Sequence, residues 1–426
     1  MKLARPYAIL AVLTLTLALS YVDRYLLAIM VQPIKAELGL SDTQIGLLTG
    51  FAFSAFYAAV GIPLARFADR GHRRAVICGS IMVWSLVTAS TAAVTNFAQL
   101  ALARFGVGAG EGGVFPTAQA IIADHVPVER RTSAMAIFAS GGSIGLLLAF
   151  ALGGALEARL GWRMSFVVMA TPALIVVPLA LLVLPPDTGS GAGSDRPGQR
   201  GWAGLGALWA NPHFRQLPFA QSAVVVLLFG QAQWLPAFFE RTHQMPRATI
   251  GAMLGLLIGI ATVAGAVIGG LIADRLRRSG EGGPIWLALF SLIAAFPLVL
   301  TLYLWAGPNA ALLLVGLTSF LFAVPTGPIA AHLQFVVAPS QRALAAAAAV
   351  MIASVFGSGL GPLAIGAASD LLSDWAGAQS LRLALLATTL AAIAWALWHL
   401  SHLLSLCRSD RAAKRDAPVR HPQHQS

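Results

Sequence analysis

Four ionisable residues lie inside apolar stretches of the sequence, Asp23 and Arg24 in one stretch and Arg104 and Glu111 in another. A charged side chain inside a bilayer costs at least ~2.5 kcal/mol, so such residues need a partner and usually have a function. Adjacent residues on a helix point about 100° apart, so Asp23 and Arg24 cannot neutralise each other along one face. We therefore expect at least one of them to bind a group on another helix.

Helical spacing brings the two carboxylates to a similar depth. Counted at about 1.5 Å per residue, Glu111 lies ~18 Å and Asp23 lies ~16 Å from the same side of the membrane. Arg104, seven residues before Glu111, falls on nearly the same helix face. Arginine keeps its proton, so Asp23 and Glu111 are the groups that can exchange protons, while the arginines can bind an anion. The alternative interpretation is a static ion-pair network that holds the helices together.

The composition indicates an integral membrane protein. Of the 426 residues, 57% are hydrophobic and 11% are charged, against about 25% charged in soluble domains. The net charge of +11 does not indicate a nucleic-acid partner, because the basic residues lie in short loops and form no patch with interleaved aromatic residues. The two cysteines, Cys78 and Cys407, give neither a disulfide framework nor a metal-ligand spacing. We expect no metal site and no cofactor.

Apolar windows of about 20 residues predict an all-α membrane protein with twelve transmembrane helices. The predicted ranges are 7–34, 44–66, 75–96, 98–123, 132–157, 162–184, 216–239, 248–272, 284–305, 309–335, 342–368 and 379–404. Most basic residues lie in the loops on the side of both termini, so the positive-inside rule predicts cytoplasmic termini. Short loops and abundant Ala and Gly favour a bacterial inner membrane.

An internal repeat divides the chain into two pseudo-symmetric halves. A shift of 205 residues aligns 41–73 on 246–278 without a gap and matches Gly46 with Gly251. Two six-helix halves of like orientation follow from this repeat. The predicted domains are an N-terminal half (1–184), a cytoplasmic linker (185–215), a C-terminal half (216–404) and a disordered cytoplasmic tail (405–426).

Two loops carry motifs that resemble the major facilitator superfamily. The first runs from Ala65 to Arg74 and reads ARFADRGHRR, and a degenerate copy, GLIADRLRR, runs from Gly270 to Arg278. The resemblance implies a transporter with this twelve-helix fold. Carboxylates at the ends of spans can pair in one conformation and separate in another, so we interpret these loops as a conformational gate. The predicted gate residues are Asp69, Arg70, Arg73, Asp274, Arg275 and Arg278.

Further motifs resemble the spinster-like branch of that superfamily. They are Asp23-Arg24, the segment RFGVGAGE from Arg104 to Glu111, the segment from Pro127 to Arg131 and the Gly-rich segment from Gly357 to Gly366. The resemblance implies transport of lysophospholipids or sphingoid-type lipids, coupled to protons. It also implies that Glu111 and Asp23 couple to protons, and that Arg24 and Arg104 bind the head group of the cargo.

The predicted C-terminal half adds polar groups to the expected cargo site. Gln231, Gln233 and His332 are its candidates for substrate binding. A cavity that is charged on one side and apolar on the other would suit an amphipathic cargo. The Gly-rich stretch from Ser140 to Gly154 is similar to the antiporter motif of drug exporters but lacks its proline. Drug/proton antiport therefore stays an alternative.

We predict a proton-coupled secondary transporter that moves a small amphipathic or anionic molecule, lysophospholipid or sphingoid-like, by alternating access. Its partners are this substrate and membrane lipids, its driving force is a proton gradient, and it acts as a monomer in the cell inner membrane. The alternatives are export of hydrophobic drugs in exchange for protons and, from another class, a membrane-embedded lipid enzyme. An enzyme is not expected, because the nine histidines are scattered and no Ser-His-Asp spacing appears.

Overall fold

The computed structural model describes residues 4–127, 130–187, 201–278, 282–338 and 341–416, and every regular element in these ranges is a helix. The N-terminal elements are α1 (Ala4–Ile29), α2 (Val31–Leu38), α3 (Asp42–Gly46), α4 (Ala52–Asp69), α5 (Arg73–Ser90), α6 (Phe97–Glu111), α7 (Val114–His125) and α8 (Arg131–Val183). The C-terminal elements are α9 (Gly201–Ala210), α10 (Pro212–Val225), α11 (Leu235–His243), α12 (Arg247–Arg277), α13 (Gly283–Leu304), α14 (Pro308–Ala323), α15 (Thr326–Val336), α16 (Arg342–Ile352), α17 (Leu360–Leu371), α18 (Ser373–Ala376) and α19 (Ser380–Asp416). π-Helical turns at Leu47–Phe51, Val226–Gly230 and Ala353–Gly359 continue into the helices that flank them.

Nine of the described helices are long and apolar enough to cross a membrane, or ten when the bent pair Pro212–Gly230 and Leu235–His243 counts as one span. This result confirms an all-helical, multi-pass membrane protein. The predicted number of twelve spans and the predicted side of the termini stay predictions.

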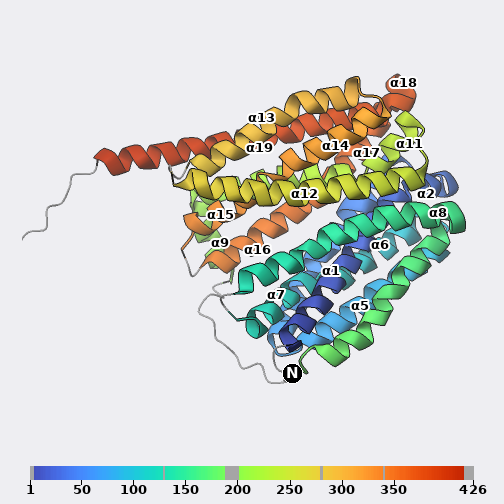
Figure 1. Ribbon diagram of the computed structural model, residues 1–426, viewed down its shortest axis with the longest axis horizontal. Helices are drawn as coiled ribbons and strands as arrows, with labels where there is room; N and C mark the ends of the chain where they lie inside the picture. The colour runs from blue at the N-terminus through green and yellow to red at the C-terminus, as the bar shows by residue number, and fades with distance from the viewer. Residues whose placement is uncertain (1–3, 128–129, 188–200, 279–281, 339–340, 417–426) are drawn as a thin grey trace, which may run out of the picture.

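Two glycine breaks interrupt the long helical runs. α8 covers 53 residues, but Gly161 within it has φ 75° and ψ 166°, which glycine adopts without steric cost. Figure 1 shows that the two parts of α8 run in opposite directions. A second break, at Gly112 and Gly113, separates α6 from α7 inside the predicted range 98–123. This second break lies directly beside Glu111.

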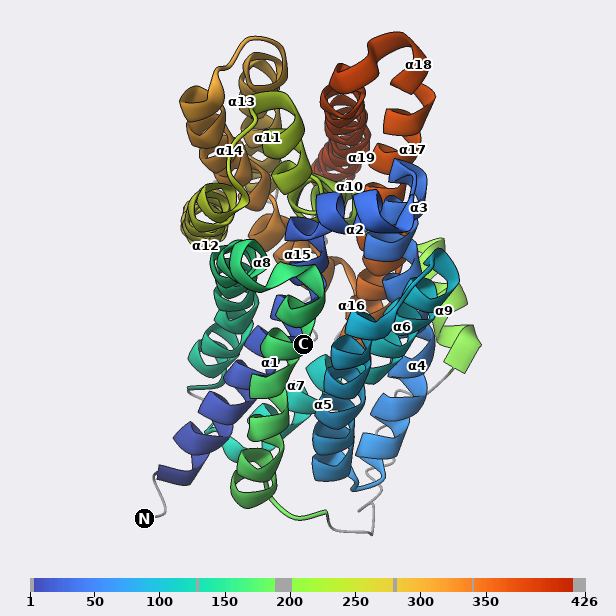
Figure 2. The same ribbon diagram turned by 90° about the vertical axis from the view of Figure 1, so that its right-hand side faces the viewer.

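The helices form two groups, α1–α8 and α10–α19, that lie side by side (Figure 1). We call these groups the N-terminal and C-terminal halves. α2, α3, α11 and α18 lie at one end of the molecule, which we call the Asp42 end and which faces the viewer in Figure 2. The start of α1 and the last turns of α19 lie towards the opposite end, which we call the terminus end. α3 packs against α17 at the junction of the halves.

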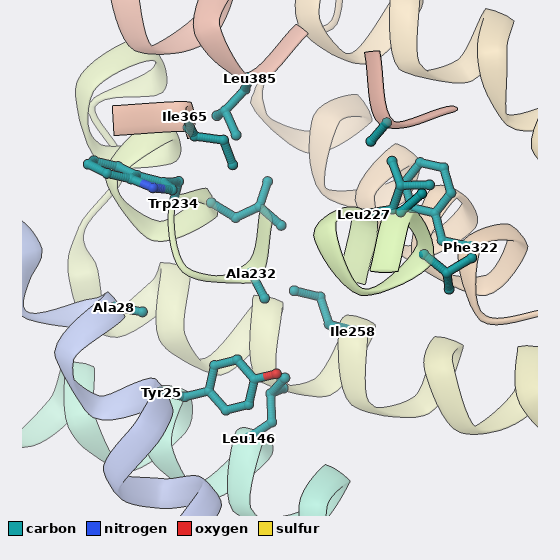
Figure 3. Close-up of a cluster of buried hydrophobic side chains, with 14 of the residues drawn as sticks. Tyr25, Ala28, Leu146, Leu227, Ala232, Trp234, Ile258, Phe322, Ile365 and Leu385 are labelled. Carbon is teal, nitrogen blue, oxygen red and sulfur yellow. The ribbon is translucent and has the colours of Figure 1, made fainter. Parts of the chain in front are cut away.

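The main buried core crosses from one half to the other. Tyr25 of α1 and Leu146 of α8 belong to the same cluster as Ile258 of α12 (Figure 3). Trp234 is fully buried in this cluster, and its indole Nε1 donates a hydrogen bond to the Pro362 carbonyl at 2.9 Å. A second core cluster lies within the N-terminal half. The halves are therefore held together partly by continuous apolar packing.

The repeated glycines make close contacts between the halves. A Cβ atom on Gly46 would lie 2.4 Å from the Pro362 carbonyl oxygen in α17. A Cβ atom on Gly251 would lie 2.0 Å from the Phe150 carbonyl oxygen in α8. Small residues allow this approach of two backbones in membrane proteins. Gly46 and Gly251 occupy equivalent positions in the two copies of the repeat, and each allows close approach of the backbone of the opposite half.

We expect Gly251→Ala to destabilise the protein, because its Cβ would overlap the Phe150 carbonyl and overpacking costs about 1–3 kcal/mol. The melting temperature of the detergent-solubilised protein measures this effect. Gly259→Ala is a matched control on the same helix, since the nearest atom to its Cβ would be the Ser143 carbonyl oxygen at 3.8 Å. A wild-type melting temperature for Gly251→Ala would contradict the close contact.

The end of the chain corrects a predicted boundary. α19 continues to Asp416, so the helix extends past residue 405, where the sequence predicted that a disordered tail begins. Leu404 and Cys407 are buried, because packing against the core goes on beyond the predicted end of the last span. Residues 417–426 of the predicted tail and 188–200 of the predicted linker lie outside the described residues.

Candidate functional site

Arg24 finds its partner on another helix. Its Nε atom donates a hydrogen bond to Glu111 Oε2 at 2.7 Å, which joins α1 to the last residue of α6. The Glu111 side chain is fully buried, whereas the Arg24 side chain is 14% exposed. Charge-assisted bonds of this kind are about twice as strong as neutral ones. The counter-charge that we expected for the Asp23-Arg24 pair is therefore present.

The other two charged residues of the predicted network are also buried. Asp23 is 2% exposed and accepts a hydrogen bond from Thr88 Oγ1 of α5 at 3.1 Å. Arg104 is equally buried, and its charge interacts with those of Asp23 and Glu111. The fold thus brings the four predicted residues together. Thr88 is a further member, which no spacing in the sequence pointed out.

The charged network leaves hydrogen-bonding capacity unused. Within the described residues, Arg104 Nε and Nη2 and Glu111 Oε1 are buried and have no hydrogen-bond partner. An unsatisfied buried polar group costs about 1–3 kcal/mol. A network that served only to hold helices together would be expected to satisfy these atoms. The lack of partners for these three atoms favours a site that takes up a proton or a ligand over a static ion-pair network.

Three aromatic rings surround the Arg24 guanidinium and form what we call the aromatic cage. Arg24 Cζ lies 4.8 Å from the ring centroids of Tyr21, Phe53 and Tyr57. Cation–π contacts contribute about 0.5–2 kcal/mol, depending on solvent exposure. The aromatic cage was not predicted from the sequence. Tyr21 alone carried a local signal, because it lies three residues before Arg24 and therefore on the same face of α1.

A cavity of about 220 Å³ lies beside the aromatic cage, between the two halves. The N-terminal half lines it with Tyr21, Arg24, Tyr25, Phe53, Ser54 and Tyr57, and the C-terminal half lines it with Val225, Leu228, Phe229, Ser354 and Ser358. Arg24 is the one charged residue among these lining residues. The cavity is therefore charged and aromatic on one side and largely apolar on the other, which is the asymmetry expected from the sequence.

The predicted glutamines do not line the central cavity. Gln233 is fully buried, and its Nε2 donates to the backbone carbonyl of Arg24 at 3.3 Å, so it joins the halves. Gln231 Oε1 accepts a hydrogen bond from the Tyr303 hydroxyl at 3.2 Å, inside the C-terminal half. The π-helical turn Val226–Gly230 precedes both residues, and the extra residue in that turn changes which side chains face the cavity. The position of Gln231 gives no support to substrate binding there.

His332 also lies apart from the central cavity. It lines a separate cavity of about 470 Å³ together with Asp274 and Arg277. The residues that line this cavity and the central one do not overlap in the described structure. His332 belongs to α15, the part of its span that continues beyond α14 towards the terminus end. Its position gives no support to binding cargo beside Arg24.

The predicted gate residues do not connect the halves in this conformation. Five of them are exposed, namely Asp69, Arg70, Asp274, Arg275 and Arg278. In the described part of the chain, no hydrogen bond or ion pair involves the carboxylates of Asp69 and Asp274. Arg73, the sixth, forms an ion pair with Asp124 inside the N-terminal half. The gate role of these residues stays a prediction.

Ion pairs between the halves lie at the Asp42 end instead. Asp42 is 2% exposed and accepts two hydrogen bonds from the Arg241 guanidinium, at 2.6 and 2.7 Å. Ser369 Oγ donates to the same carboxylate at 2.7 Å. The Asp370 carboxylate accepts from the backbone N–H groups of Asp42 and Thr43 at 3.0 and 2.7 Å. We call the contacts of Asp42 with Arg241, Ser369 and Asp370 the Asp42 latch.

A second ion pair joins the halves at the same end. Arg247 of α12 pairs with Glu157 of α8 and with Glu240. The 205-residue offset of the repeat matches Arg247 with Asp42 and Glu240 with Lys35, and Lys35 pairs with Asp42 in turn. The two copies of the repeat therefore keep the position of a charged pair but exchange the signs of the charges.

Comparison with known proteins identifies the family of this helical bundle. The family model described as Major Facilitator Superfamily matches residues 13–362. The chain belongs to this superfamily. This member of the Major Facilitator Superfamily is 33% identical to an MFS-type efflux pump of Mycolicibacterium smegmatis, over 90% of this chain and 89% of that protein. It is 29% identical to Protein spinster homolog 1 of Homo sapiens, over 86% of this chain and 74% of that protein.

A solved structure shows the same fold. It is the crystal structure of a bacterial homolog of the human lysosomal transporter spinster, in an inward-facing and unoccupied conformation. The TM-score is 0.83 at 24% identity, with 94% of this chain and 98% of that chain covered. The predicted resemblance to the superfamily and to its spinster-like branch is confirmed. The chain is accordingly a multi-pass membrane transporter, and its relatives are transporters rather than enzymes.

Proposed function

We propose that the chain is a proton-coupled secondary transporter that moves a small amphipathic or anionic organic molecule by alternating access. The observation that carries this proposal is the Arg24–Glu111 pair beside a cavity between the halves. Arg24 offers a permanent positive charge to an anionic head group. Glu111 is a buried carboxylate inside a span, and such groups serve as proton relays in transporters. Proton and cargo thus meet at one ion pair.

In this mechanism the uptake of a proton by Glu111 prepares Arg24 for cargo. Protonation removes the negative charge of Glu111, so the Arg24 guanidinium loses its ionic partner. The aromatic cage holds the guanidinium beside the cavity, where a carboxylate or phosphate of the cargo replaces Glu111 as counter-charge. Arg104 and Asp23 supply a second pair of charges with which the proton can be shared. Protonation and cargo binding therefore favour each other, and by linkage cargo affinity rises as the pH falls.

Alternating access requires that contacts between the halves close one end of the molecule while the other end is open, and that the two ends exchange these states. The Asp42 latch closes the Asp42 end, and its bonds must break before the cavity opens there. We assign the complementary contacts to two segments at helix ends on the terminus end, most of whose charged residues are exposed in this conformation. Those segments contain Asp69, Arg70 and Arg73, between the end of α4 and the start of α5, and Asp274, Arg275 and Arg278 at the end of α12.

The proposal includes twelve spans with both termini in the cytoplasm of a bacterial inner membrane. As one straight helix, the 51-residue run Ser133–Val183 would be about 77 Å long, more than twice the ~30 Å hydrocarbon core. Its turn at Gly161 divides it into two spans. α6 with α7 supplies another span, as does the bent pair Pro212–Gly230 and Leu235–His243. The Asp42 end then faces the periplasm, and the transporter acts as a monomer.

The size and lining of the central cavity support a lipid-like cargo. Its volume of about 220 Å³ is below the ~300–1,000 Å³ typical of ligand pockets, so it admits a head group rather than a whole amphiphile. The apolar wall formed by Val225, Leu228 and Phe229 then contacts the start of the hydrocarbon chain. A lysophospholipid or sphingoid-like molecule has this division into a head group and a single chain.

A second candidate function is efflux of hydrophobic compounds in exchange for protons. The observation that favours it is the 33% identity to an MFS-type efflux pump. A cargo without an anionic group would contact the aromatic rings of Tyr21, Phe53 and Tyr57. It would have no need of the Arg24 charge, and this difference separates the two candidates.

Transport by the purified protein in proteoliposomes tests the proposal. A pH gradient is imposed, and the fluxes of a labelled lysophospholipid and of a labelled hydrophobic drug are measured separately. We expect gradient-driven lysophospholipid flux at least tenfold above that of protein-free liposomes, lost in Arg24→Ala. Arg159→Ala is the matched control, because Arg159 is an exposed arginine far in the sequence from the site. Drug flux that survives Arg24→Ala would favour the second candidate, and flux of neither compound would contradict both.

A further inference from the structure

Three potential metal ligands from distant parts of the sequence meet at the terminus end. They are His213 in the first turn of α10, His332 in α15 and Cys407 near the end of α19. One ligand atom of each lies within 4.8 Å of those of the other two. Cys407 Sγ is 3.9 Å from His332 Nε2, and the two imidazole centroids are 6.2 Å apart.

These distances are close to those of a tetrahedral zinc site. Zinc binds cysteine sulfur at ~2.3 Å and histidine nitrogen at ~2.0–2.1 Å. A tetrahedral arrangement therefore places sulfur ~3.6 Å from nitrogen and the two nitrogens ~3.3 Å apart. The sulfur–nitrogen distance of 3.9 Å differs from this value by a few tenths of an ångström. The other separations are at most 4.8 Å, so no pair of ligand atoms has to approach by more than about 1.5 Å.

The fold holds the three side chains on fixed elements. Asn211 caps the start of α10, and its Nδ2 atom donates to the Val336 carbonyl at the end of α15 at 2.7 Å. This bond ties the helix of His213 to the helix of His332. Cys407 is 3% exposed, so packing against the core fixes its position. The ligand cluster is therefore built from helices rather than from loops, which favours a defined geometry.

The surroundings of the cluster suit a bound cation. The cluster lines the cavity of about 470 Å³ that also contains Asp274 of α12. That carboxylate adds a negative charge to the same cavity. Arg277, the positive residue of the same cavity, is held over the Phe335 ring at 3.1 Å from its centroid. The space beside the three ligands leaves a coordination position open.

We propose that His213, His332 and Cys407 bind a thiophilic transition-metal ion of the zinc class. Two imidazoles and a thiolate prefer Zn²⁺ and its first-row neighbours, whereas Mg²⁺ and Ca²⁺ prefer oxygen ligands. The site is separate from the central cavity and does not depend on the proposed cargo. A bound ion connects α10, α15 and α19 at the terminus end, next to the last turn of α12 with Asp274.

Cobalt titration of the full-length protein, purified in detergent without a polyhistidine tag, tests this site. Co²⁺ replaces Zn²⁺ in such sites, and a Co²⁺–thiolate bond gives a charge-transfer absorption in the near ultraviolet. We expect this absorption to saturate at a single equivalent per chain and to disappear when Zn²⁺ is added. His421 and His424 of the C-terminal segment do not produce a thiolate band. Wild-type protein that shows no saturable band would overturn the proposal.

Variants assign the band to the three residues. Cys407→Ser should abolish the absorption, whereas Cys78→Ser should retain it, because Cys78 is the other buried cysteine and lies in α5. His332→Gln and His213→Gln should each weaken Co²⁺ binding at least tenfold while the protein remains monodisperse in gel filtration. Zn²⁺ should also raise the melting temperature of wild-type protein but not of Cys407→Ser. A band that persists in Cys407→Ser, or unchanged affinity in both histidine variants, would show that the cluster is a hydrogen-bonded contact without a metal.

Discussion

Glu111→Gln is expected to reduce transport driven by a pH gradient at least tenfold, while exchange of cargo without a gradient continues. Glutamine keeps the shape of the side chain, and its carbonyl oxygen can still accept the Arg24 Nε hydrogen bond that Glu111 accepts at 2.7 Å. It cannot take up or release a proton. A neutral partner also leaves Arg24 available to the cargo at every pH, so we expect cargo binding to lose its dependence on pH.

The measurement is flux into proteoliposomes with and without an imposed pH gradient, using the cargo found with wild-type protein. Glu37→Gln is the matched control, because Glu37 is an exposed carboxylate between the predicted spans 7–34 and 44–66, where it bonds Trp162 and Arg163. Asp23→Asn separates the two carboxylates of the network. If Asp23→Asn loses coupling and Glu111→Gln keeps it, Asp23 is the coupling residue. Transport that stays fully coupled to the pH gradient in both variants would contradict the proposed role of the charged network.

Asp42→Asn is expected to open the Asp42 end of the transporter. Asp42 is buried and accepts two hydrogen bonds from Arg241 and one from Ser369. The neutral amide loses the ionic part of these bonds, and a hydrogen bond to a charged group contributes about 1.5–3 kcal/mol. A loss of about 2 kcal/mol changes the ratio of closed to open molecules roughly thirtyfold. The cavity then faces the opposite side of the membrane in a larger fraction of molecules.

Spin labels on two exposed alanines report this opening. Ala36→Cys places one label in the N-terminal half, and Ala378→Cys places the other in the C-terminal half, both near the Asp42 end. We expect pulsed electron paramagnetic resonance to give a longer distance between the two labels in Asp42→Asn than in the labelled protein without that substitution. The distance between the labels should be unchanged in Glu37→Gln, because the ion pair of Glu37 with Arg163 lies within one half. Distances that do not move in Asp42→Asn would contradict the latch.

A charge-reversed variant distinguishes opening from general damage to the fold. Lys35→Glu, Asp42→Arg and Arg241→Glu, combined in one protein, give the first repeat copy the arrangement of signs that Glu240 and Arg247 have in the second. This combination should restore the short distances, because each charge again faces its opposite. A variant that stays open would show that the signs of the two copies are not interchangeable.

The fold and the central ion pair followed from the sequence for physical reasons. A bilayer permits only structures that satisfy their own backbone hydrogen bonds, so long apolar windows indicate helices with little ambiguity. A buried charge requires a counter-charge, and helical rise alone put Glu111 at the depth of Asp23 and Arg24. The prediction that one of this pair binds another helix is confirmed by the bond between Arg24 and Glu111.

The direction in which individual side chains point could not be predicted from the sequence. The π-helical turn Val226–Gly230 rotates the residues that follow it, so Gln231 bonds Tyr303 instead of facing the cavity. Such a turn depends on tertiary packing, and no residue type marks it. The aromatic cage could not be predicted for a similar reason, because Phe53 and Tyr57 of α4 reach Arg24 of α1 only when the helices of the N-terminal half assemble.

Contacts between residues that are far apart in the chain also could not be predicted from local sequence patterns. Asp42 and Arg241 are 199 residues apart in the chain, and Lys35, Arg241 and Arg247 appear in the sequence as ordinary loop charges. His332 and Cys407 are 75 residues apart, so no ligand spacing indicated the cluster at the terminus end. A motif search detects residues that are close in sequence, whereas these groups become neighbours only through helix packing.

The exchanged signs at Asp42 and Arg247 decide which half can assemble with which. A molecule made of two N-terminal halves would set the Asp42 carboxylate of one copy against Glu157 of the other. Two C-terminal halves would set Arg247 against Arg241. Both combinations place like charges in contact, which costs several kcal/mol. The two ion pairs therefore favour assembly of an N-terminal half with a C-terminal half and disfavour assembly of two identical halves.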